Sequence, residues 1–185
     1  FGPSDILSKG MIVGMNRLGE AFSANRAFVP EMLMAARCMS AATELLKPLM
    51  VGEGTEPVGR VCLGTVKGDM HDIGKNLVKI MMEGSGIEVF DLGVDTSAEQ
   101  FVSTAVENHC GVIACSSLLT TTMEEMREVV KLVHERGLQD QVKVIIGGAP
   151  ISQSFCDEIG ADYYAEDAGV SAREAVAILK AQKAS

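Results

Sequence analysis

An apolar run passes directly into a helical pattern in residues 58–82, VGRVCLGTVKGDMHDIGKNLVKIMM. The apolar residues of Val58 to Val66 predict a buried strand, and the spacing of those in Gly74 to Met82 predicts a helix. A polar loop joins the two. A strand that leads at once into a helix is the beginning of a βα unit and favours a parallel sheet.

The same alternation repeats to the end of the chain. Further strands are expected over Ile87–Leu92, Gly111–Cys115, Val142–Ile146 and Asp162–Ala165, and further helices over Ala98–Asn108, Met123–Arg136, Ser152–Ile159 and Val170–Gln182. Five such units predict an α/β, flavodoxin-like (Rossmann-like) fold, in which a doubly wound five-stranded parallel sheet carries helices on both faces. Ligands of such folds bind at the carboxyl ends of the strands, so the loops that follow the strands are the place to look for a site.

The first half of the chain is helical by its period. Apolar residues recur at steps of three and four from Leu7 to Phe22, behind the candidate N-cap Ser4, and a second helix is expected from Pro30 to Leu45. Two helices cannot enclose a core, so they must pack on the second half, on a partner or on helices upstream of Phe1. We expect an all-α domain over 1–52, a Gly/Pro/acidic linker over 53–57 and the α/β domain over 58–185.

Composition excludes several classes of protein. With 47% hydrophobic residues in 185 the chain can bury a core, and a net charge of −9 argues against nucleic acid or an anionic membrane as the main partner. Neither a membrane-spanning run nor a signal peptide is evident, which predicts a cytoplasmic protein. The five cysteines (Cys38, Cys62, Cys110, Cys115 and Cys156) form no C-x-x-C motif and are expected to be mostly buried free thiols.

Two nucleotide-binding motifs fail on their spacing. Between Gly68 and Gly74 lie five residues, where a P-loop has four, and Asn76 stands where a P-loop carries Ser or Thr. The glycines of Gly84-Ser85-Gly86 precede a strand, whereas a dinucleotide fingerprint follows one. ATP and NAD are therefore not expected as ligands.

The loop after the first strand carries a histidine between two aspartates. Residues two apart in an extended loop project to the same side, so Asp69 can accept a hydrogen bond from one imidazole nitrogen of His71 while the other nitrogen faces a ligand. One histidine and one carboxylate are too few for a zinc or iron site, so a metal here must bring most of its own ligands, as a macrocycle does. The alternative is a solvated histidine or one that caps the next helix.

Two further motifs follow the next strands of the predicted sheet. Residues 116–118 (SSL) come after the third strand, and Gly147-Gly148 comes after the fourth. Taken alone, the serines fit a helix cap and the glycines an ordinary turn. Because all three motifs lie at the carboxyl ends of adjacent strands, one elongated ligand can touch them all.

With these motifs the chain resembles the cobalamin-binding domains of methionine synthase and of the corrinoid proteins of methylotrophic and acetogenic methyltransferase systems. Residues 69–74 (DMHDIG), 116–118 and 147–148 match the three-part signature of that family in order. Residues 15–22 and 28–30 are similar to its helical cap domain. The resemblance covers essentially the whole chain.

The resemblance implies a role for each matching residue. His71 would replace the dimethylbenzimidazole of cobalamin as the lower axial ligand of cobalt, Asp69 would hydrogen-bond His71, and Ser116 would be the next member of that relay. The other residues implied to contact the cofactor are Met70, Asp72, Ile73 and Gly74 in the loop, Ser116, Leu118, Thr120, Gly147 and Gly148 along the displaced nucleotide tail, and Phe22 and Val29 over the methyl-bearing face.

The function implied is that of a methyl carrier, which is itself not a catalyst. A substrate-specific methyltransferase would place a methyl group on cobalt, and a second methyltransferase would pass it to an acceptor such as a folate or a thiol. A reductive activase would be a further partner, whereas nucleic acid and membrane would not. The cap would swing away about residues 52–57, and because such caps resemble four-helix bundles, a helix pair is expected before Phe1.

Three other functions stay open. A cobalamin-dependent sensor joins a similar cap to this domain but usually carries a DNA-binding segment. The small subunit of an adenosylcobalamin mutase shares the motif around His71 but usually lacks a cap with residues like Phe22 and Val29. The last alternative is a cofactor-free flavodoxin-like partner protein. No loop residue distinguishes methanol, methylamines, betaines, thiols or methoxylated aromatics as the methyl donor.

Overall fold

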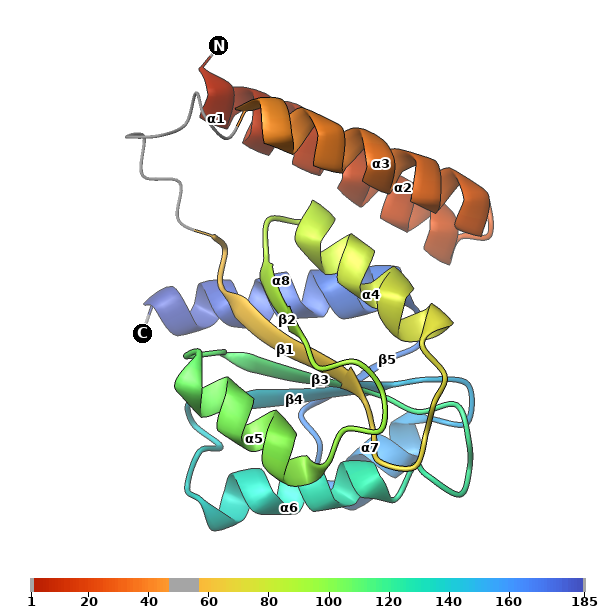
Figure 1. Cartoon of the computed structure of the whole chain (residues 1–185), viewed down its shortest axis with the longest axis vertical. Helices are drawn as coiled ribbons and strands as arrows, with labels where there is room; N and C mark the ends of the chain where they lie inside the picture. The colour runs from red at the N-terminus through yellow and green to blue at the C-terminus, as the bar shows by residue number, and fades with distance from the viewer. Residues whose placement is uncertain (1, 47–56, 185) are drawn as a thin grey trace.

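A five-stranded parallel sheet forms the centre of the computed structural model, which describes residues 2–46 and 57–184 (Figure 1). Its order is β2-β1-β3-β4-β5, and every neighbouring pair is parallel. The strands are β1 Arg60–Thr65, β2 Glu88–Asp91, β3 Val112–Ser116, β4 Lys143–Gly147 and β5 Tyr163–Ala165. The flavodoxin-like fold predicted from the sequence is thereby confirmed.

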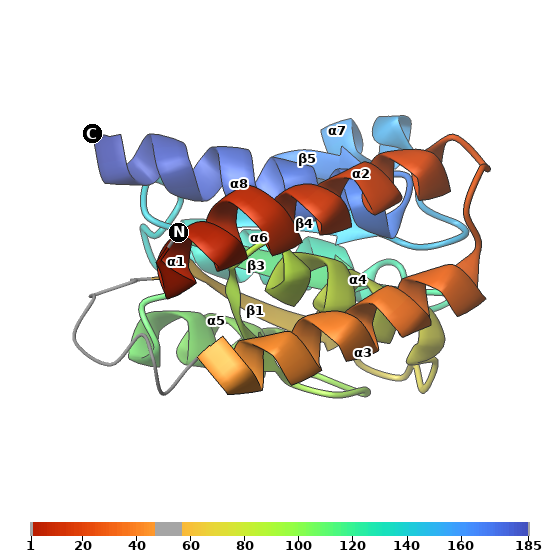
Figure 2. The ribbon, with the colours of Figure 1, turned by 90° about the horizontal axis from the view of Figure 1, so that it is seen from above.

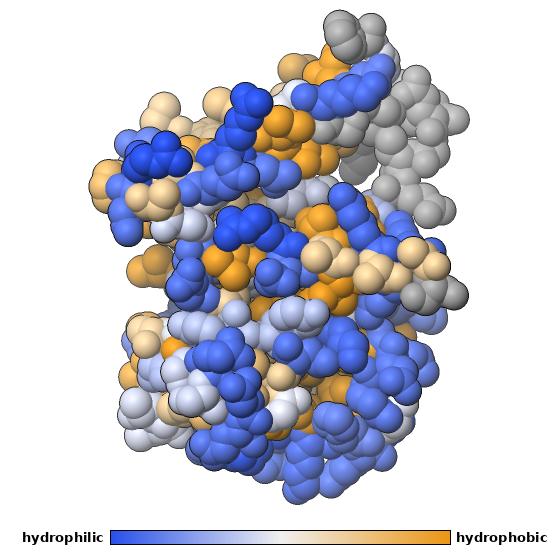
Figure 3. Space-filling view, turned by 180° about the vertical axis from the view of Figure 1, so that it is seen from behind, coloured by the Kyte–Doolittle hydropathy of each residue, from blue (hydrophilic) through white to orange (hydrophobic). Residues whose placement is uncertain are grey.

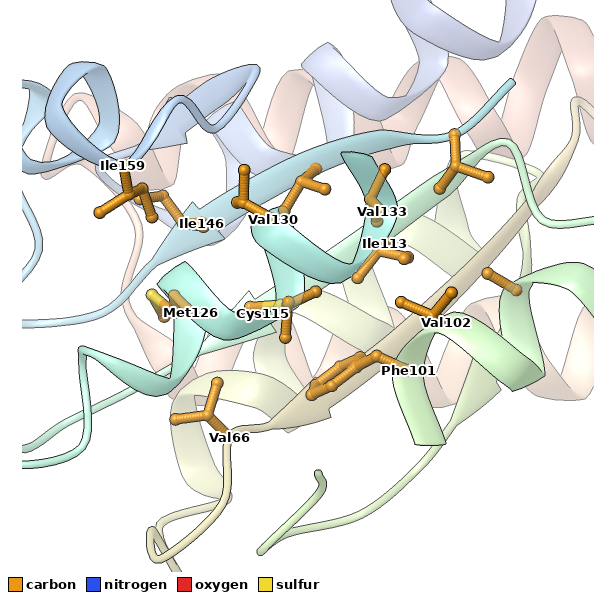
Figure 4. Packing of buried hydrophobic residues seen from close by; sticks show 14 of the residues in the cluster. Val66, Phe101, Val102, Ile113, Cys115, Met126, Val130, Val133, Ile146 and Ile159 are labelled. Atoms are coloured by element: carbon orange, nitrogen blue, oxygen red, sulfur yellow. The ribbon is translucent and has the colours of Figure 1, made fainter. Parts of the chain in front are cut away.

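Helices cover both faces of this sheet. One face is covered by α4 (Ile73–Gly84) and α8 (Ala168–Ala184), and the other by α5 (Ala98–Glu107), α6 (Glu125–Glu135) and α7 (Gln153–Ile159). Successive strand residues project to opposite faces, so each strand contributes to both cores, and this explains why the strands read as continuous apolar runs. Figure 4 shows the core on the face of α5, α6 and α7, where Val133 of α6 lies near Ile113 of β3 and Met126, at the start of α6, lies towards Cys115.

The N-terminal helices form a separate layer on α4 and α8 (Figures 1 and 2). They comprise α1 (Pro3–Asp5), the π-helical segment η1 (Ile6–Met11), α2 (Ile12–Ser23) and α3 (Val29–Leu46). Of the three packing partners considered for these helices, the second half of the chain is the one found, because Met15 and Met32 are buried in the same core as α4 and α8. The expected linker and the domain boundary at residue 52 fall outside the described residues, except for Pro57.

The prediction that Ser4 caps the first helix is wrong. The cap of the first helix is Gly2, because Pro3 takes the first helical position, where its missing N–H costs no hydrogen bond. Four of the five cysteines are buried and Cys38 is exposed, and all five are free, as expected for most of them.

The surface differs between the two layers. Figure 3, a view from behind, shows hydrophobic patches on the helical layer and between the layers, whereas the lower part of the α/β domain is mainly hydrophilic. The exposed large hydrophobic residues of the helical layer are Ile6, Val13, Phe28, Val29, Leu33, Met34 and Leu45. Within the described part of the chain, no helix combines the length and apolar character needed to cross a bilayer.

Candidate functional site

The loop from β1 to α4 is fixed by hydrogen bonds at both ends. Thr65 Oγ1 donates to the carbonyl of His71 at 2.8 Å, and the N–H of Gly68 donates to Asp95 Oδ1 at 2.7 Å. Gly68 has φ of 78°, a left-handed conformation in which glycine is unstrained. The loop is therefore held in one shape against the carboxyl ends of β1 and β2.

Asp69 and His71 contact each other as the two-residue spacing predicts. Oδ1 of Asp69 lies 2.7 Å from Nδ1 of His71 and also accepts the backbone N–H of His71 at 3.0 Å. The side chain of Asp69 is fully buried, whereas that of His71 is 51% exposed. A carboxylate acceptor places the imidazole proton on Nδ1, so Nε2, which has no hydrogen-bond partner among the described residues, keeps a free lone pair.

The second oxygen of Asp69 is held by the loop after β3. Oδ2 accepts the backbone N–H of Leu118 at 2.8 Å, Thr122 Oγ1 at 3.0 Å and Ser117 Oγ at 3.4 Å. The expectation that Ser116 is the next member of the relay is therefore wrong. Ser116 ends β3 and lines a cavity beside α4 and α8, and the alternation of the strand sends the next side chain, Ser117, towards Asp69.

These contacts decide the charge of Asp69. Burial by itself raises the pKa of a carboxyl group, but the hydrogen bonds from the N–H groups of Leu118 and His71, from the His71 ring and from Thr122 outweigh it, and the pKa of Asp69 lies well below its usual range. Asp69 is thus an ionised carboxylate that holds the orientation and the tautomer of His71.

The surroundings of His71 suit a large ligand with apolar edges. Met70 is 68% exposed, Ile73 79% and Leu118 45%, although residues of this size are usually covered. A Cβ added at Gly74 would meet nothing within 4 Å. Asp72 and Thr120 are also exposed. In the described ranges no three His, Cys, Asp or Glu side chains come together as a metal site, so a metal that brings its own ring of ligands fits this donor set.

A cavity of about 310 Å³ runs from this rim between the sheet and helices α4 and α8. Among the predicted residues it is lined by Phe22, Gly74, Ser116, Gly147 and Gly148. Val29 does not line it and is 41% exposed, and Leu118 and Thr120 stay at the rim. Of the two cap residues, the structure thus brings only Phe22 to the cavity.

The two glycines after β4 have a structural role as well. A Cβ at Gly148, whose φ is 134°, would overlap the carbonyl oxygen of Ser117, and a Cβ at Gly147 would lie 2.9 Å from the carbonyl oxygen of Ala165. Both positions are therefore too crowded for any other residue.

Sequence reasoning missed part of the cavity wall. Two further parts of the chain also line it: Leu77 and Val78 of α4, and residues 166–168 and 171 around the start of α8. No motif marks these positions; the only signal was that the β5–α8 loop lies at a strand carboxyl end. A larger hollow of about 900 Å³ lies at the opposite end of the sheet and contains none of the predicted residues.

Comparisons with known proteins relate both parts of the chain to B12-binding proteins. A B12 binding domain model matches residues 59–177, and a second B12 binding domain model matches residues 1–47. Dimethylamine corrinoid protein 1 of Methanosarcina acetivorans is 44% identical over 178 residues, which cover 96% of this chain and 84% of the relative.

Two solved structures match the fold of this chain over nearly its whole length. A cobalamin-binding protein from Desulfitobacterium hafniense gives a TM-score of 0.81 at 34% identity, covering 93% of this chain and 80% of that one. The methanol:cobalamin methyltransferase complex of Methanosarcina barkeri gives a TM-score of 0.83 at 29% identity. The match covers 96% of this chain and 67% of the chain in that structure. From the two domain matches, the relative and the first of these structures, we conclude that the chain belongs to the B12-binding corrinoid proteins.

Proposed function

We propose that the chain is a methyl carrier: a substrate-specific methyltransferase loads a methyl group onto its corrinoid, and a second methyltransferase removes it. The observation that carries the proposal is the Asp69–His71 hydrogen bond, which leaves Nε2 of His71 free at an open apolar rim. The relatives that are named as corrinoid proteins support it.

His71 is the residue that would hold cobalt, through Nε2. When bound, the corrinoid supplies a cobalt centre that alternates between a methyl-bearing form and a strongly nucleophilic form. Asp69 keeps the proton of His71 on Nδ1 while Nε2 is in use as a ligand. The buried carboxylate on the Nδ1 side thus keeps the ring turned so that Nε2 faces the open rim.

The helical layer would act as a movable cover. Phe22 lines the cavity, and its neighbour Ser23 donates to Asp167 Oδ1 at 3.0 Å across the two layers. Moving the layer aside requires a hinge, which we place at residues 52–57, outside the described ranges except for Pro57. Shortening or stiffening this segment should slow methyl transfer without loss of corrinoid binding; equal loss of both would contradict the hinge.

A methylated amine is the donor that the comparisons favour. Dimethylamine corrinoid protein 1 is 44% identical to this chain over the aligned residues, and the matched chain of the methanol:cobalamin methyltransferase complex is 29% identical. A folate or a thiol is the proposed acceptor, and a reductive activase a further partner. The test measures how fast the purified dimethylamine and methanol methyltransferases each load a methyl group onto this protein. Faster loading from dimethylamine is expected, and faster loading from methanol would contradict the preference for an amine.

The axial ligand is tested by spectroscopy of the loaded protein. We expect the cobalt(II) form to show nitrogen hyperfine splitting in its EPR spectrum, and the pattern should change when the histidines carry ¹⁵N. His71→Ala should abolish the protein-derived splitting. His134→Ala, at an exposed position of α6, is the matched control and should leave it intact. A His71→Ala protein with unchanged splitting would show that another group binds cobalt.

A further inference from the structure

The inner part of the cavity is apolar on its sheet side. Leu63 of β1 stands beside Ala114 of β3, which stands beside Ile145 of β4, and all three line the cavity from one row of the sheet. The next row towards the rim contains Ser116 and Gly147, two residues further along their strands. The polar strand residues of the lining, Ser116 and Tyr164, therefore both lie further towards the rim than the row of Leu63, Ala114 and Ile145.

One hydroxyl inside this cavity has no protein partner. Ser171, on the first turn of α8, is 4% exposed, and its backbone N–H donates to the carbonyl of Asp167. Its side chain has no hydrogen bond to any described residue. The other buried serines and threonines of the described chain each donate a hydrogen bond to a protein acceptor: Thr65, Ser85, Thr96, Ser117 and Thr122.

The Ser171 hydroxyl faces the cavity with its hydrogen-bonding capacity unused by any described residue, whereas most polar groups in a protein interior have a partner. Ser171 is not needed for the helix, because alanine at this position is a better helix former. Its position in the wall of the cavity, opposite the apolar row of the sheet, makes a ligand atom the natural partner.

We infer that Ser171 is a specificity-determining residue for the base at the end of the corrinoid's nucleotide tail, and that it favours a benzimidazole over a purine. The inference rests on the proposed function. A benzimidazole that is not bound to cobalt presents one acceptor nitrogen and otherwise carbon edges, which match one hydroxyl and an apolar floor. Adenine adds an amino group and further ring nitrogens, which Leu63, Ala114 and Ile145 leave unpaired at the inner end of the cavity. The acidic residues of the lining, Glu166 and Asp167, follow β5 and so lie at the outer end.

The test is a titration of the cofactor-free protein, followed by absorbance, with three corrinoids: cobalamin, the cobamide with an adenine base, and cobinamide, which lacks the nucleotide tail. We expect cobalamin to bind at least about tenfold more tightly than the adenine cobamide, since unpaired polar groups weaken binding by that order. Ser171→Ala should weaken cobalamin binding about fivefold and leave cobinamide binding unchanged.

Ser103→Ala is the matched control. Ser103 lies on α5, on the other face of the sheet, and donates only to the carbonyl of Gln100. This variant should bind all three corrinoids as the parent does, and thermal unfolding checks that both variants fold.

The possible failures are distinguishable. If Ser171→Ala changes cobalamin and cobinamide binding equally or not at all, Ser171 does not read the tail. If the parent binds both cobamides equally, the base preference is wrong. If cobinamide binds without a histidine ligand, or no corrinoid binds, the proposed function fails and this inference with it.

Discussion

The Asp69 site and the helical layer are held together in opposite ways. Both oxygens of Asp69 are saturated by hydrogen bonds from two loops, and the carboxylate is completely buried. The helical layer is held mainly by methionine and glycine packing, with hydrogen bonds from Ser23 to Asp167 and from Ser85 to Asn16. Directional bonds fix a geometry, whereas methionine contacts adapt when a surface moves. The molecule thus combines a rigid ligand-orienting site with a cover that can move.

The largest effect should come from breaking the rigid side of this comparison. Asp69→Ala removes the acceptor of the Leu118 N–H and of the Thr122 hydroxyl and frees the ring of His71. We expect the free energy of unfolding, measured by urea denaturation without cofactor, to fall by about 3 kcal/mol. Asp72→Ala, at an exposed position, should change it far less; equal losses would mean that the network around Asp69 contributes nothing special.

A second pair of variants separates what the fold needs from what the ligand needs. Gly148→Ala drives a Cβ into the carbonyl of Ser117 and should destabilise the protein by about 2 kcal/mol. Gly74→Leu points into open space and should leave stability within about 0.5 kcal/mol but weaken corrinoid binding. Urea denaturation and absorbance titration give the two readouts. Normal binding by Gly74→Leu would remove Gly74 from the site.

A third variant loosens the cover at a position remote from the Asp69–His71 contact. Gly169 of α8 lies against α2, where an added Cβ would come within 2.9 Å of Ser23 Oγ and 3.1 Å of the carbonyl of Gly19. Gly169→Leu should therefore push α2 away and raise amide exchange there about tenfold, with little change in β1. Hydrogen exchange read by mass spectrometry decides the matter, and a uniform increase in both segments would indicate general destabilisation instead.

The smallest effect concerns Asp91, a carboxylate outside the site whose lowered pKa makes the stability of the fold depend on pH. Burial raises its pKa, but hydrogen bonds from Lys75, from the N–H of Gly93 and from Lys79 lower it more, so the pKa lies below the usual value. Asp91 therefore adds stability above the unfolded carboxyl pKa, about 3.9, and this is lost as the pH falls through the lower folded value.

Lys79→Gln removes the weaker and more exposed of its two lysine contacts, at 3.2 Å. The pKa of Asp91, followed by NMR of the carboxyl carbon, should rise slightly, so that the acid loss begins at a higher pH. Stability at neutral pH should change by no more than about 0.5 kcal/mol. A fall in the pKa would contradict the assignment of Lys79 as a stabilising partner.

Sequence patterns predicted the fold well because the strands are buried on both faces and the loops follow them directly. The Asp69–His71 contact was predictable because it depends only on two-residue spacing in an extended loop. The partners of Asp69 in the loop after β3 could not be predicted, because Ser117 and Thr122 reach Asp69 through a turn whose shape does not follow from the local sequence. Which cap residue reaches the cavity, Phe22 and not Val29, depends on how two packed layers dock.

The core shared by the two layers has a practical consequence for dissecting the protein. Met81 and Met82 of α4 are almost completely buried, and Met15 and Met32 of the helical layer belong to the same cluster. A fragment beginning at Pro57 would keep its whole sheet but expose this methionine-rich face to water. Such a fragment should fold yet self-associate, so concentration-dependent sedimentation would be its first sign of a missing layer.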